Sequence, residues 1–294
     1  MPLEEVSRCP VCQGASFSLL HTSKDFTTTR ELFHVKQCNS CSLILTSPRP
    51  TASGSSHYYQ SDAYISHAAK SKSIFDTIYL IVRHLSLQWK FSLVKEFVTT
   101  GPILDFGCGT GAFLNKVRSN GLQVYGVEPS ASARENINNE ITVSDSIDSL
   151  PNTQFEAVTL WHVLEHVYDL GTTIQKLRAR LSEHGTIFIA VPNWESFDAA
   201  HYHEYWAAYD VPRHLWHFSK KSMQTLLQNN GLKIQKIVPM KLDAYYVSLL
   251  SEKYIHNGSL SLISIFNALR VGFLSNLKGR RRTNHSSLIF VVQK

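Results

Sequence analysis

Seven consecutive residues, Asp105 to Gly111 (DFGCGTG), combine one carboxylate with three glycines at alternate positions. Glycine lets another molecule approach the backbone closely, so a glycine-rich turn is typical of a nucleotide-binding loop. A dinucleotide fingerprint requires G-x-G-x-x-G, whereas here the third glycine, Gly111, comes one residue too early after Gly107 and Gly109. The carboxylate of Asp105 would repel a pyrophosphate and attract an ammonium group. Spacing and charge therefore indicate a cationic nucleoside rather than a dinucleotide.

A second acid, Glu128 in YGVEPS, ends the next apolar run of the chain. In dinucleotide-binding folds an acid at this point accepts hydrogen bonds from the ribose hydroxyls. S-adenosylmethionine combines an adenosine with a cationic amino-acid tail and carries no phosphate, so it satisfies both observations. Taken alone, the glycines could simply form a tight turn and Glu128 could simply be a solvated acid. The glycine loop followed by the acid, in this order, favours binding of the cofactor.

Four of the five cysteines form two Cys-x-x-Cys pairs, Cys9 with Cys12 and Cys38 with Cys41. Two such pairs can present four thiolates to one ion, which is typical of structural zinc sites. Two disulfides are the alternative, and a cytosolic compartment disfavours them. Because four sulfurs leave no open coordination position, we expect Zn²⁺ to stabilise this segment rather than to catalyse.

Strands and helices alternate through most of the chain and must position these residues. The apolar runs that indicate strands are 102–107, 122–128, 141–144, 155–161, 185–191, 232–239 and 287–294. Helical patterns cover 73–99, 111–121, 130–138, 169–181 and 219–231, with Asp169 and Ser219 as expected caps. This alternation predicts βαβ units and an α/β fold with a doubly wound, mostly parallel sheet.

The expected organisation has three parts. Residues 1–50 form the zinc-ribbon segment, and residues 51–100 form a Ser-, Thr- and Pro-rich linker with a helical N-terminal cover. Residues 101–294 form the cofactor-binding domain, with a helical insertion at about 241–285.

The motifs ILDFGCGTGAFL, VYGVEPS and LWHVLEHV make residues 100–240 similar to the class I S-adenosylmethionine-dependent methyltransferases. The resemblance implies a Rossmann-like sheet of seven strands and the transfer of a methyl group. It implies the following cofactor-binding residues: Asp105, Gly107, Cys108, Gly109, Gly111, Glu128, Pro129, Asp145, Trp161 and His162. The zinc segment and PRHLWHFS narrow it to small-molecule methyltransferases, including sugar C-methyltransferases. We therefore expect a small polar acceptor, such as a sugar or lipid-linked molecule, methylated on carbon or oxygen.

The segment HVLEH, from His162 to His166, has the order of ligands found in inverted zinc proteases. That site requires one face of a long helix, whereas His162 is expected where a strand ends. Some methyltransferases similar to this chain hold Mg²⁺ with an acid-x-x-Glu-His segment here, and this chain has His162 in place of the first acid. We expect Glu165 and His166 to stabilise the turn, with His166 also a candidate to contact the substrate.

Residues 201–219 (HYHEYWAAYDVPRHLWHFS) form a loop rich in histidine and aromatic residues. Long loops within compact domains are usually functional, so we interpret this loop as a lid over the acceptor. Its predicted substrate-binding residues are Tyr205, Tyr209, Arg213 and His217; packing over the sheet edge is the alternative. Similarity to sugar C-methyltransferases places His214 at their general base, and histidine suits proton removal near neutral pH.

Residues 258–282 form a nearly uncharged run that ends in a basic cluster, Lys278 to Arg282. Arg270, Asn267 and several serines make the run too polar to span a bilayer. We expect a helical cover over the substrate pocket, and an interfacial helix that contacts anionic lipid is the alternative.

The composition and the first residues of the chain bear on its expected partners and location. The net charge of +6 is spread thinly, and the zinc segment contains only four Lys and Arg before residue 42, so nucleic acid is disfavoured as a partner. An RNA methyltransferase and a non-catalytic cofactor-binding module stay as alternatives. The first residues, MPLEEVSRCP, lack the apolar region of a signal peptide, so we expect a cytoplasmic location. The sequence leaves the oligomeric state open.

Overall fold

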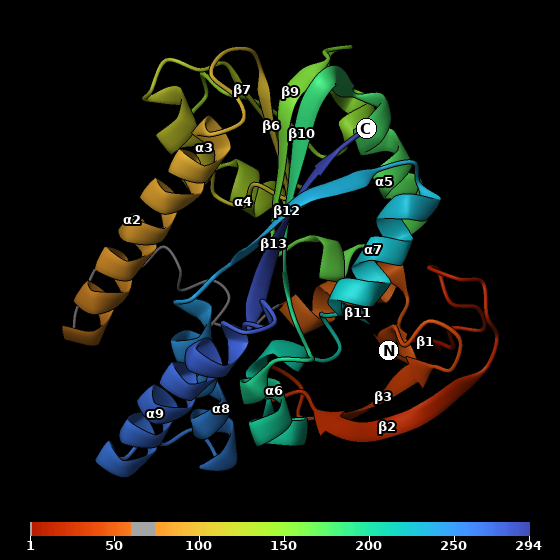
Figure 1. The fold of residues 1–294 in the computed structure, drawn as a ribbon, viewed down its shortest axis with the longest axis vertical. Helices are drawn as coiled ribbons and strands as arrows, with labels where there is room; N and C mark the ends of the chain where they lie inside the picture. The colour runs from red at the N-terminus through yellow and green to blue at the C-terminus, as the bar shows by residue number, and fades with distance from the viewer. Residues whose placement is uncertain (1, 60–73) are drawn as a thin grey trace.

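A seven-stranded sheet with the order β12-β13-β10-β9-β6-β7-β8 forms the centre of the molecule (Figure 1). The computed structural model describes residues 2–59 and 74–294, without the side chains of residues 74–83. The strands of the sheet are β6 (Ile103–Phe106), β7 (Val124–Val127), β8 (Thr142–Ser144), β9 (Phe155–Trp161), β10 (Leu181–Pro192), β12 (Lys233–Pro239) and β13 (Ser287–Gln293). Within this sheet β13 is antiparallel to both neighbours and the other pairs are parallel, which confirms the predicted fold class.

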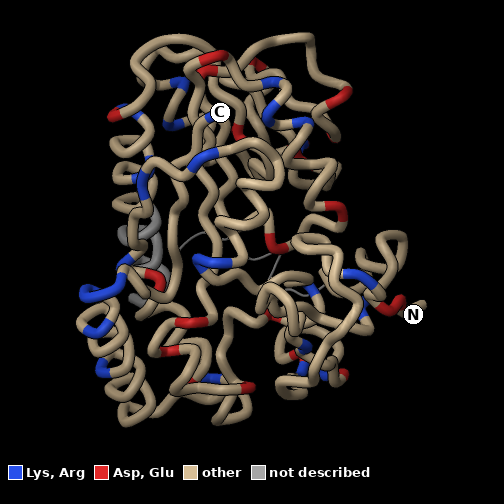
Figure 2. Tube along the Cα trace, turned by 45° about the vertical axis from the view of Figure 1, so that its right-hand side comes forward, with Lys and Arg blue, Asp and Glu red and all other residues tan. Residues whose placement is uncertain are grey.

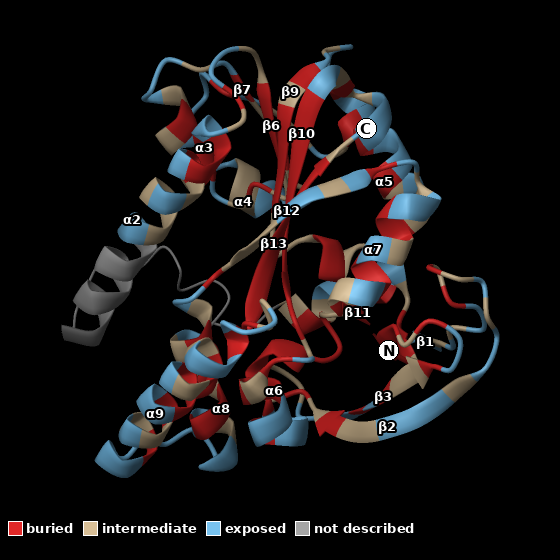
Figure 3. Ribbon diagram, viewed as in Figure 1, coloured by how far each residue is buried: buried red, intermediate tan, exposed pale blue. Residues whose placement is uncertain are grey.

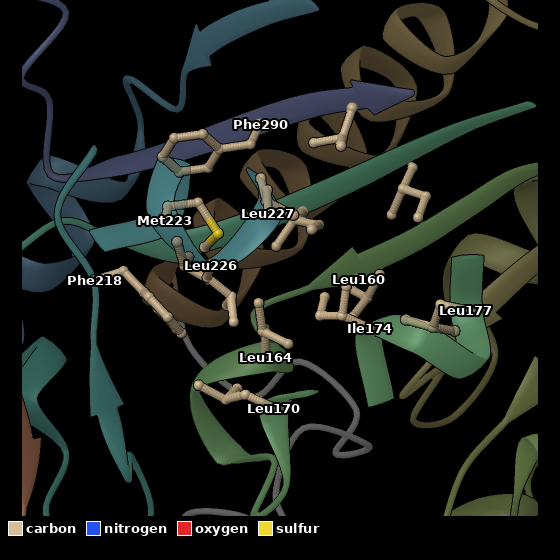
Figure 4. Close-up of a cluster of buried hydrophobic side chains, with 14 of the residues drawn as sticks. Leu160, Leu164, Leu170, Ile174, Leu177, Phe218, Met223, Leu226, Leu227 and Phe290 are labelled. Atoms are coloured by element: carbon tan, nitrogen blue, oxygen red, sulfur yellow. The ribbon is translucent and has the colours of Figure 1, made fainter. Parts of the chain in front are cut away.

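Helices cover both faces of the sheet. One face carries α5 (Leu170–Ala179) and α7 (Lys220–Asn229), and the other carries α2 (Ile74–Lys95) and α3 (Ala112–Arg118). The middle strands are nearly continuous runs of buried residues, as expected where both faces of a parallel sheet are covered (Figure 3). Figure 4 shows the hydrophobic core on the α5 and α7 face, in which Ile174 of α5 lies beside Leu160 of the sheet and Leu226 of α7 lies near Leu164.

Local sequence signals explain where several helices begin and end. The side chain of Asp169 accepts a hydrogen bond from the Thr172 N–H, and Ser219 forms a capping box, so both predicted caps are confirmed. The helix predicted over 130–138 is much shorter, because α4 comprises only Ala131–Arg134. The Asn-rich residues that follow disfavour helix, since asparagine side chains compete for backbone hydrogen bonds.

The N-terminal segment forms a four-stranded antiparallel sheet with the order β11-β4-β3-β2. Its own strands are β2 (Phe17–Lys24), β3 (Leu32–Cys38) and β4 (Ile44–Thr46), and a short pair joins β1 (Leu3–Glu4) to β5 (Arg49–Pro50). The fourth strand, β11 (Trp216–His217), comes from the predicted lid. The segment also shares one hydrophobic core with the main sheet, so the first and last of the three predicted parts pack as one unit.

Two helices, α8 (Asp243–Ile255) and α9 (Leu262–Gly279), occupy the predicted insertion between β12 and β13. They pack against each other, and α9 also packs against α6 (Phe197–Tyr202) (Figure 1). Residues 60–73 of the predicted linker lie outside the described residues. Across the described helices, none combines the length and the apolar character that crossing a bilayer requires.

Candidate functional site

The candidate site lies where the strand order reverses, at the carboxyl ends of β6 and β9. The chain moves from β6 outward to β7 and β8, then returns to place β9 on the other side of β6. Ligands of doubly wound sheets bind at this point, because loops that leave adjacent strands in opposite directions separate there. The loop from Gly107 to Gly111 follows β6 directly.

The three glycines of this loop all have left-handed backbone conformations, with φ of 76°, 53° and 75°. A Cβ atom at Gly107 would lie 2.5 Å from Val163, so this glycine is required for packing. At Gly109, by contrast, a Cβ would meet no described atom within 4 Å. The bare backbone of Gly109 is therefore the part of the loop that another molecule could approach.

The carboxylate of Glu128 holds the loop in this shape. Its Oε2 accepts a hydrogen bond from the Gly109 N–H at 2.9 Å, and its Oε1 accepts one from the Ser130 N–H at 2.9 Å. The acid and the loop are thus adjacent, as the sequence predicts. Cys108 is buried with its sulfur beside Gly126, and its backbone N–H and carbonyl bond to Val127 and Gly111, so as a cofactor contact it stays a prediction.

Asp105 is almost completely buried at the end of β6. Its Oδ1 accepts a hydrogen bond of 2.6 Å from the Thr159 hydroxyl on the neighbouring strand β9. Burial raises the pKa of Asp105 to about 7, although the Thr159 hydrogen bond and the charge of Lys90 oppose that rise. The carboxyl group can therefore gain or lose its proton near neutral pH.

Lys90 of α2 reaches into this site, although no motif in the sequence indicated it. Its Nζ lies 4.8 Å from the ring centre of Trp161, which also packs edge-on against Phe113. Burial lowers the pKa of Lys90, and the charges of Asp243 and Asp105 oppose that change. The ammonium group of Lys90 thus lies over the Trp161 ring and close enough to Asp105 to be influenced by its charge.

His162 follows β9 in a left-handed conformation, with φ of 57°. Its Nε2 lies 3.1 Å from Asp243 Oδ2 at the start of α8, and its Nδ1 lies 3.4 Å from Glu165 Oε1. Burial alone would lower the pKa of His162, but these two carboxylates raise it to about 9. The structure therefore places a protonated imidazole beside the predicted cofactor loop and ties it to the insertion.

A second group of titratable side chains consists of Glu165, His166 and His214, whose ligand atoms all lie within 4.8 Å of one another. Glu165 is fully buried, and among the described residues neither of its carboxylate oxygens has a hydrogen-bond partner. His166 Nδ1 lies 3.0 Å from the Arg213 carbonyl, and His214 Nδ1 lies 2.9 Å from the Ala208 carbonyl. Because a carbonyl only accepts, both Nδ1 atoms carry hydrogen, and Nε2 is the ring atom that carries the lone pair in each neutral imidazole.

The remaining predicted substrate residues lie toward the N-terminal segment. The guanidinium of Arg213 is buried and pairs with Asp210 at 2.6 Å and with Asp25 at 2.9 Å. His217 Nε2 lies 3.2 Å from the hydroxyl of Thr46, Tyr209 is buried beside the same histidine, and Tyr205 is at the surface near Phe26. The contacts of these four residues join the lid to the N-terminal sheet. Their predicted role in binding the substrate stays a prediction.

Two predicted cofactor residues lie at the rim. Asp145 follows β8 and is exposed, with Oδ1 accepting a hydrogen bond from Ser149 at 3.3 Å. The carbonyl of Pro129 accepts a hydrogen bond from Arg134 at 2.8 Å. Both residues follow strands at the same edge of the sheet as Glu128, which is the side where an adenine would extend from the ribose.

The four paired cysteines come together in the N-terminal segment. The Sγ atoms of Cys9 and Cys41 are 3.5 Å apart, as are those of Cys12 and Cys38. Zn–S bonds of 2.3 Å in a tetrahedron would place sulfurs about 3.8 Å apart. Each pair is followed by a matching turn, in which the N–H of the fourth residue after the first cysteine bonds back to that cysteine's carbonyl at 2.9 Å. The donor set therefore fits a tetrahedral Zn²⁺ ion.

Comparison with known proteins points the same way. The family model of the methyltransferase domain matches residues 83–237. A ubiquinone biosynthesis O-methyltransferase of Bradyrhizobium diazoefficiens is 32% identical over 111 residues, which cover 33% of this chain and 43% of that protein. A mitochondrial ubiquinone biosynthesis O-methyltransferase from Bos taurus is 29% identical over 167 residues, which cover 47% of this chain and 43% of that protein. The chain thus matches less than half the length of these relatives.

Among solved structures, a SAM-dependent methyltransferase from Archaeoglobus fulgidus superposes with a TM-score of 0.50 at 17% sequence identity. The match covers 72% of this chain and 94% of that structure. At this identity the likeness supports the fold of the sheet and its helices.

Proposed function

We propose that the chain, which belongs to the methyltransferase domain family, binds S-adenosylmethionine at the loop after β6. It then transfers the methyl group of this cofactor to an oxygen of a small molecule. The observation that carries this proposal is the pair of acids at the glycine loop, Asp105 and Glu128. The relatives named as O-methyltransferases support oxygen as the methylated atom. A sugar or a lipid-linked molecule stays a proposal for the acceptor.

The residues of the site fit the three parts of this cofactor. The carboxylate of Glu128 accepts one hydrogen bond each from the backbone of Gly109 and Ser130. Its oxygens can accept further hydrogen bonds from the ribose hydroxyls. Asp105 offers a negative charge to the ammonium group, and Lys90 offers a positive charge to the carboxylate of the same tail. Trp161 provides an aromatic face that would attract the sulfonium. NADH would instead bring two phosphates toward two carboxylates.

Calorimetry with S-adenosylmethionine, S-adenosylhomocysteine and NADH tests this proposal on the folded, metal-loaded protein. Heat with the first two compounds and none with NADH is expected. Binding of NADH alone would overturn the assignment, and binding without any transfer to candidate acceptors would leave a cofactor-binding module instead of an enzyme.

The reaction requires little chemistry from the protein itself. A lone pair on the acceptor oxygen forms the new O–C bond while the C–S bond breaks, and its electrons stay on sulfur. Alignment of oxygen, carbon and sulfur can supply roughly 7–11 kcal/mol. A proton acceptor is needed when the acceptor is a hydroxyl, and His214, the predicted base, lies in the group formed with Glu165 and His166.

We further propose that this group holds a divalent transition metal. Glu165 is fully buried, and among the described residues its only charged partner is His162, at 3.4 Å, without a hydrogen bond to either oxygen. Both histidines would have to offer Nε2 to an ion, because Nδ1 of each is bonded to a carbonyl. Two imidazoles and one carboxylate suit such ions better than Mg²⁺, which prefers oxygen ligands. An ion there would hold the acceptor oxygen and lower the pKa of its hydroxyl, so that the proton could pass to water. His214 would then be a ligand and not the base, because both of its ring nitrogens would be occupied.

Replacing Glu165 by glutamine is expected to reduce the bound metal from about two equivalents to about one, because the cysteine site would stay filled. Mass spectrometry after loading with Zn²⁺, Mn²⁺ or Co²⁺ and dialysis measures this loss. His256→Ala is the control, since His256 also lies beside a glutamate but is exposed, directly after α8. Retention of both equivalents by the Glu165 variant, or a parent protein with only one, would leave His214 as a base without metal.

Cofactor affinity should depend on pH through Asp105. Since its pKa is about 7 and only the carboxylate attracts the ammonium group, affinity should fall about tenfold per pH unit below 7 and level off above 8. Titration calorimetry between about pH 5.5 and 8.5 gives this profile. Asp105→Asn should bind more weakly and with a flat profile. An unchanged slope in this variant would assign the pH dependence to another group.

A further inference from the structure

Helix α9 directs its large apolar side chains outward. Leu262, Ile263, Phe266, Leu269, Phe273 and Leu277 are between 46% and 86% exposed. At about 100° per residue, these six lie within an arc of about 120° on the helix surface. An apolar arc of this width normally faces a protein core, and here it faces away from the protein.

The inward face of α9 consists mostly of small residues. Ser264, Ala268, Gly272 and Ser275 are buried, together with Val271. Added bulk at Gly272 would collide with Tyr245 of α8, whose ring lies 2.6 Å from the position of a Cβ atom. The close approach of α8 therefore uses the small residues, and the large ones contribute little to folding of the chain.

Positive charge lies within the apolar arc, at Arg270, and at the C-terminal end of α9. From residue 257 to residue 294 the chain contains no Asp or Glu and six Lys and Arg. Five of them, Arg270, Lys278, Arg280, Arg281 and Arg282, are exposed on α9 or directly after it. Figure 2 shows Lys and Arg along the lower left helix. Apolar and cationic groups thus share one surface.

We propose that this surface, the outer face of α9 with Arg280–Arg282, binds an anionic membrane, with the helix lying in the plane of the lipid headgroups. An interfacial helix buries one apolar face at the headgroup boundary and gains attraction from acidic lipids. A second copy of this chain is the other candidate occupant. It would place two acid-free, basic surfaces against each other, so charge favours the membrane.

Flotation of the full chain with phospholipid vesicles tests the proposal without cofactor or acceptor, so the result is independent of the methyl transfer. The chain should float with vesicles containing phosphatidylglycerol, float less with phosphatidylcholine alone, and dissociate at high salt. Phe266→Ser with Phe273→Ser should lower the bound fraction at least about tenfold. Replacing Arg280, Arg281 and Arg282 by glutamine should remove the preference for the anionic lipid.

The matched control is Leu19→Ser with Leu32→Ser, which changes two equally exposed leucines of the N-terminal sheet and should leave vesicle binding unchanged. The melting temperature of the double phenylalanine variant should equal that of the parent, because both side chains are exposed. Absence of binding to anionic vesicles, or equal loss in the leucine control, would overturn the proposal. So would a dimer in sedimentation that the phenylalanine changes dissociate.

Discussion

Replacement of Cys38 by serine is expected to remove the metal from the N-terminal segment and to unfold that segment. Binding of structural Zn²⁺ contributes about 10–16 kcal/mol in small zinc domains at neutral pH. The hairpin β2–β3 exposes several leucines and buries mainly Phe33 and Val35, so much of the stability of its fold should depend on the ion. Zinc content by mass spectrometry and a thermal melt with and without a chelator measure the two effects.

The loss should spread to the proposed acceptor site. β4 pairs with β11, and Arg213 is held by Asp25 of the same segment, so unfolding would release the chain both before and after His214. Cys108→Ser is the control, because Cys108 lies in the glycine loop and should leave zinc content unchanged. A Cys38 variant that keeps its zinc, or loses it with an unchanged melting temperature, would contradict the structural role.

Replacement of Glu128 by alanine is expected to weaken S-adenosylmethionine binding about 100-fold or more. The change removes two charge-assisted hydrogen bonds to the ribose, each worth about 1.5–3 kcal/mol, and it frees the Gly109 N–H that the carboxylate now holds. Glu128→Gln should have a smaller effect, because the amide keeps one acceptor oxygen. Calorimetry on both variants separates the loss of charge from the loss of shape.

Glu135→Ala is the matched control for this change, since Glu135 is exposed seven residues further along and should not alter affinity. Circular dichroism should show both proteins folded. An alanine variant of Glu128 that binds the cofactor within about threefold of the parent would show that the ribose lies elsewhere.

The strands and helices of the main sheet, and the place of the glycine loop beside Glu128, could be predicted from sequence because their signals are local. The glycine spacing, the acid at the end of β7 and the caps Asp169 and Ser219 each lie within a few residues of the feature that they specify. The parallel sheet follows from long runs of buried residues with helices between them. These features need no knowledge of distant contacts.

Lys90 and Asp243 could not be predicted, because their roles depend on elements distant in the chain. Lys90 belongs to a helix whose apolar repeat indicates packing only, and Asp243 begins the insertion, yet both lie near Asp105 or His162. The same limit applied to the lid. Its aromatic and basic residues suggested a binding wall, and the structure joins several of them to a sheet that begins near the N-terminus.

The four-stranded sheet also sets an order for assembly during synthesis. Its third strand ends at Thr46, and its last strand begins at Trp216, 170 residues later (216 − 46). At roughly 5–20 residues per second, the ribosome would need about 10–30 s to make that intervening chain. Throughout that interval the hairpin has an unpaired edge, and its cysteines are available to capture an ion. Metal binding can therefore precede completion of the fold. The strand β11 would then pair with an edge of the sheet that the bound ion had already ordered.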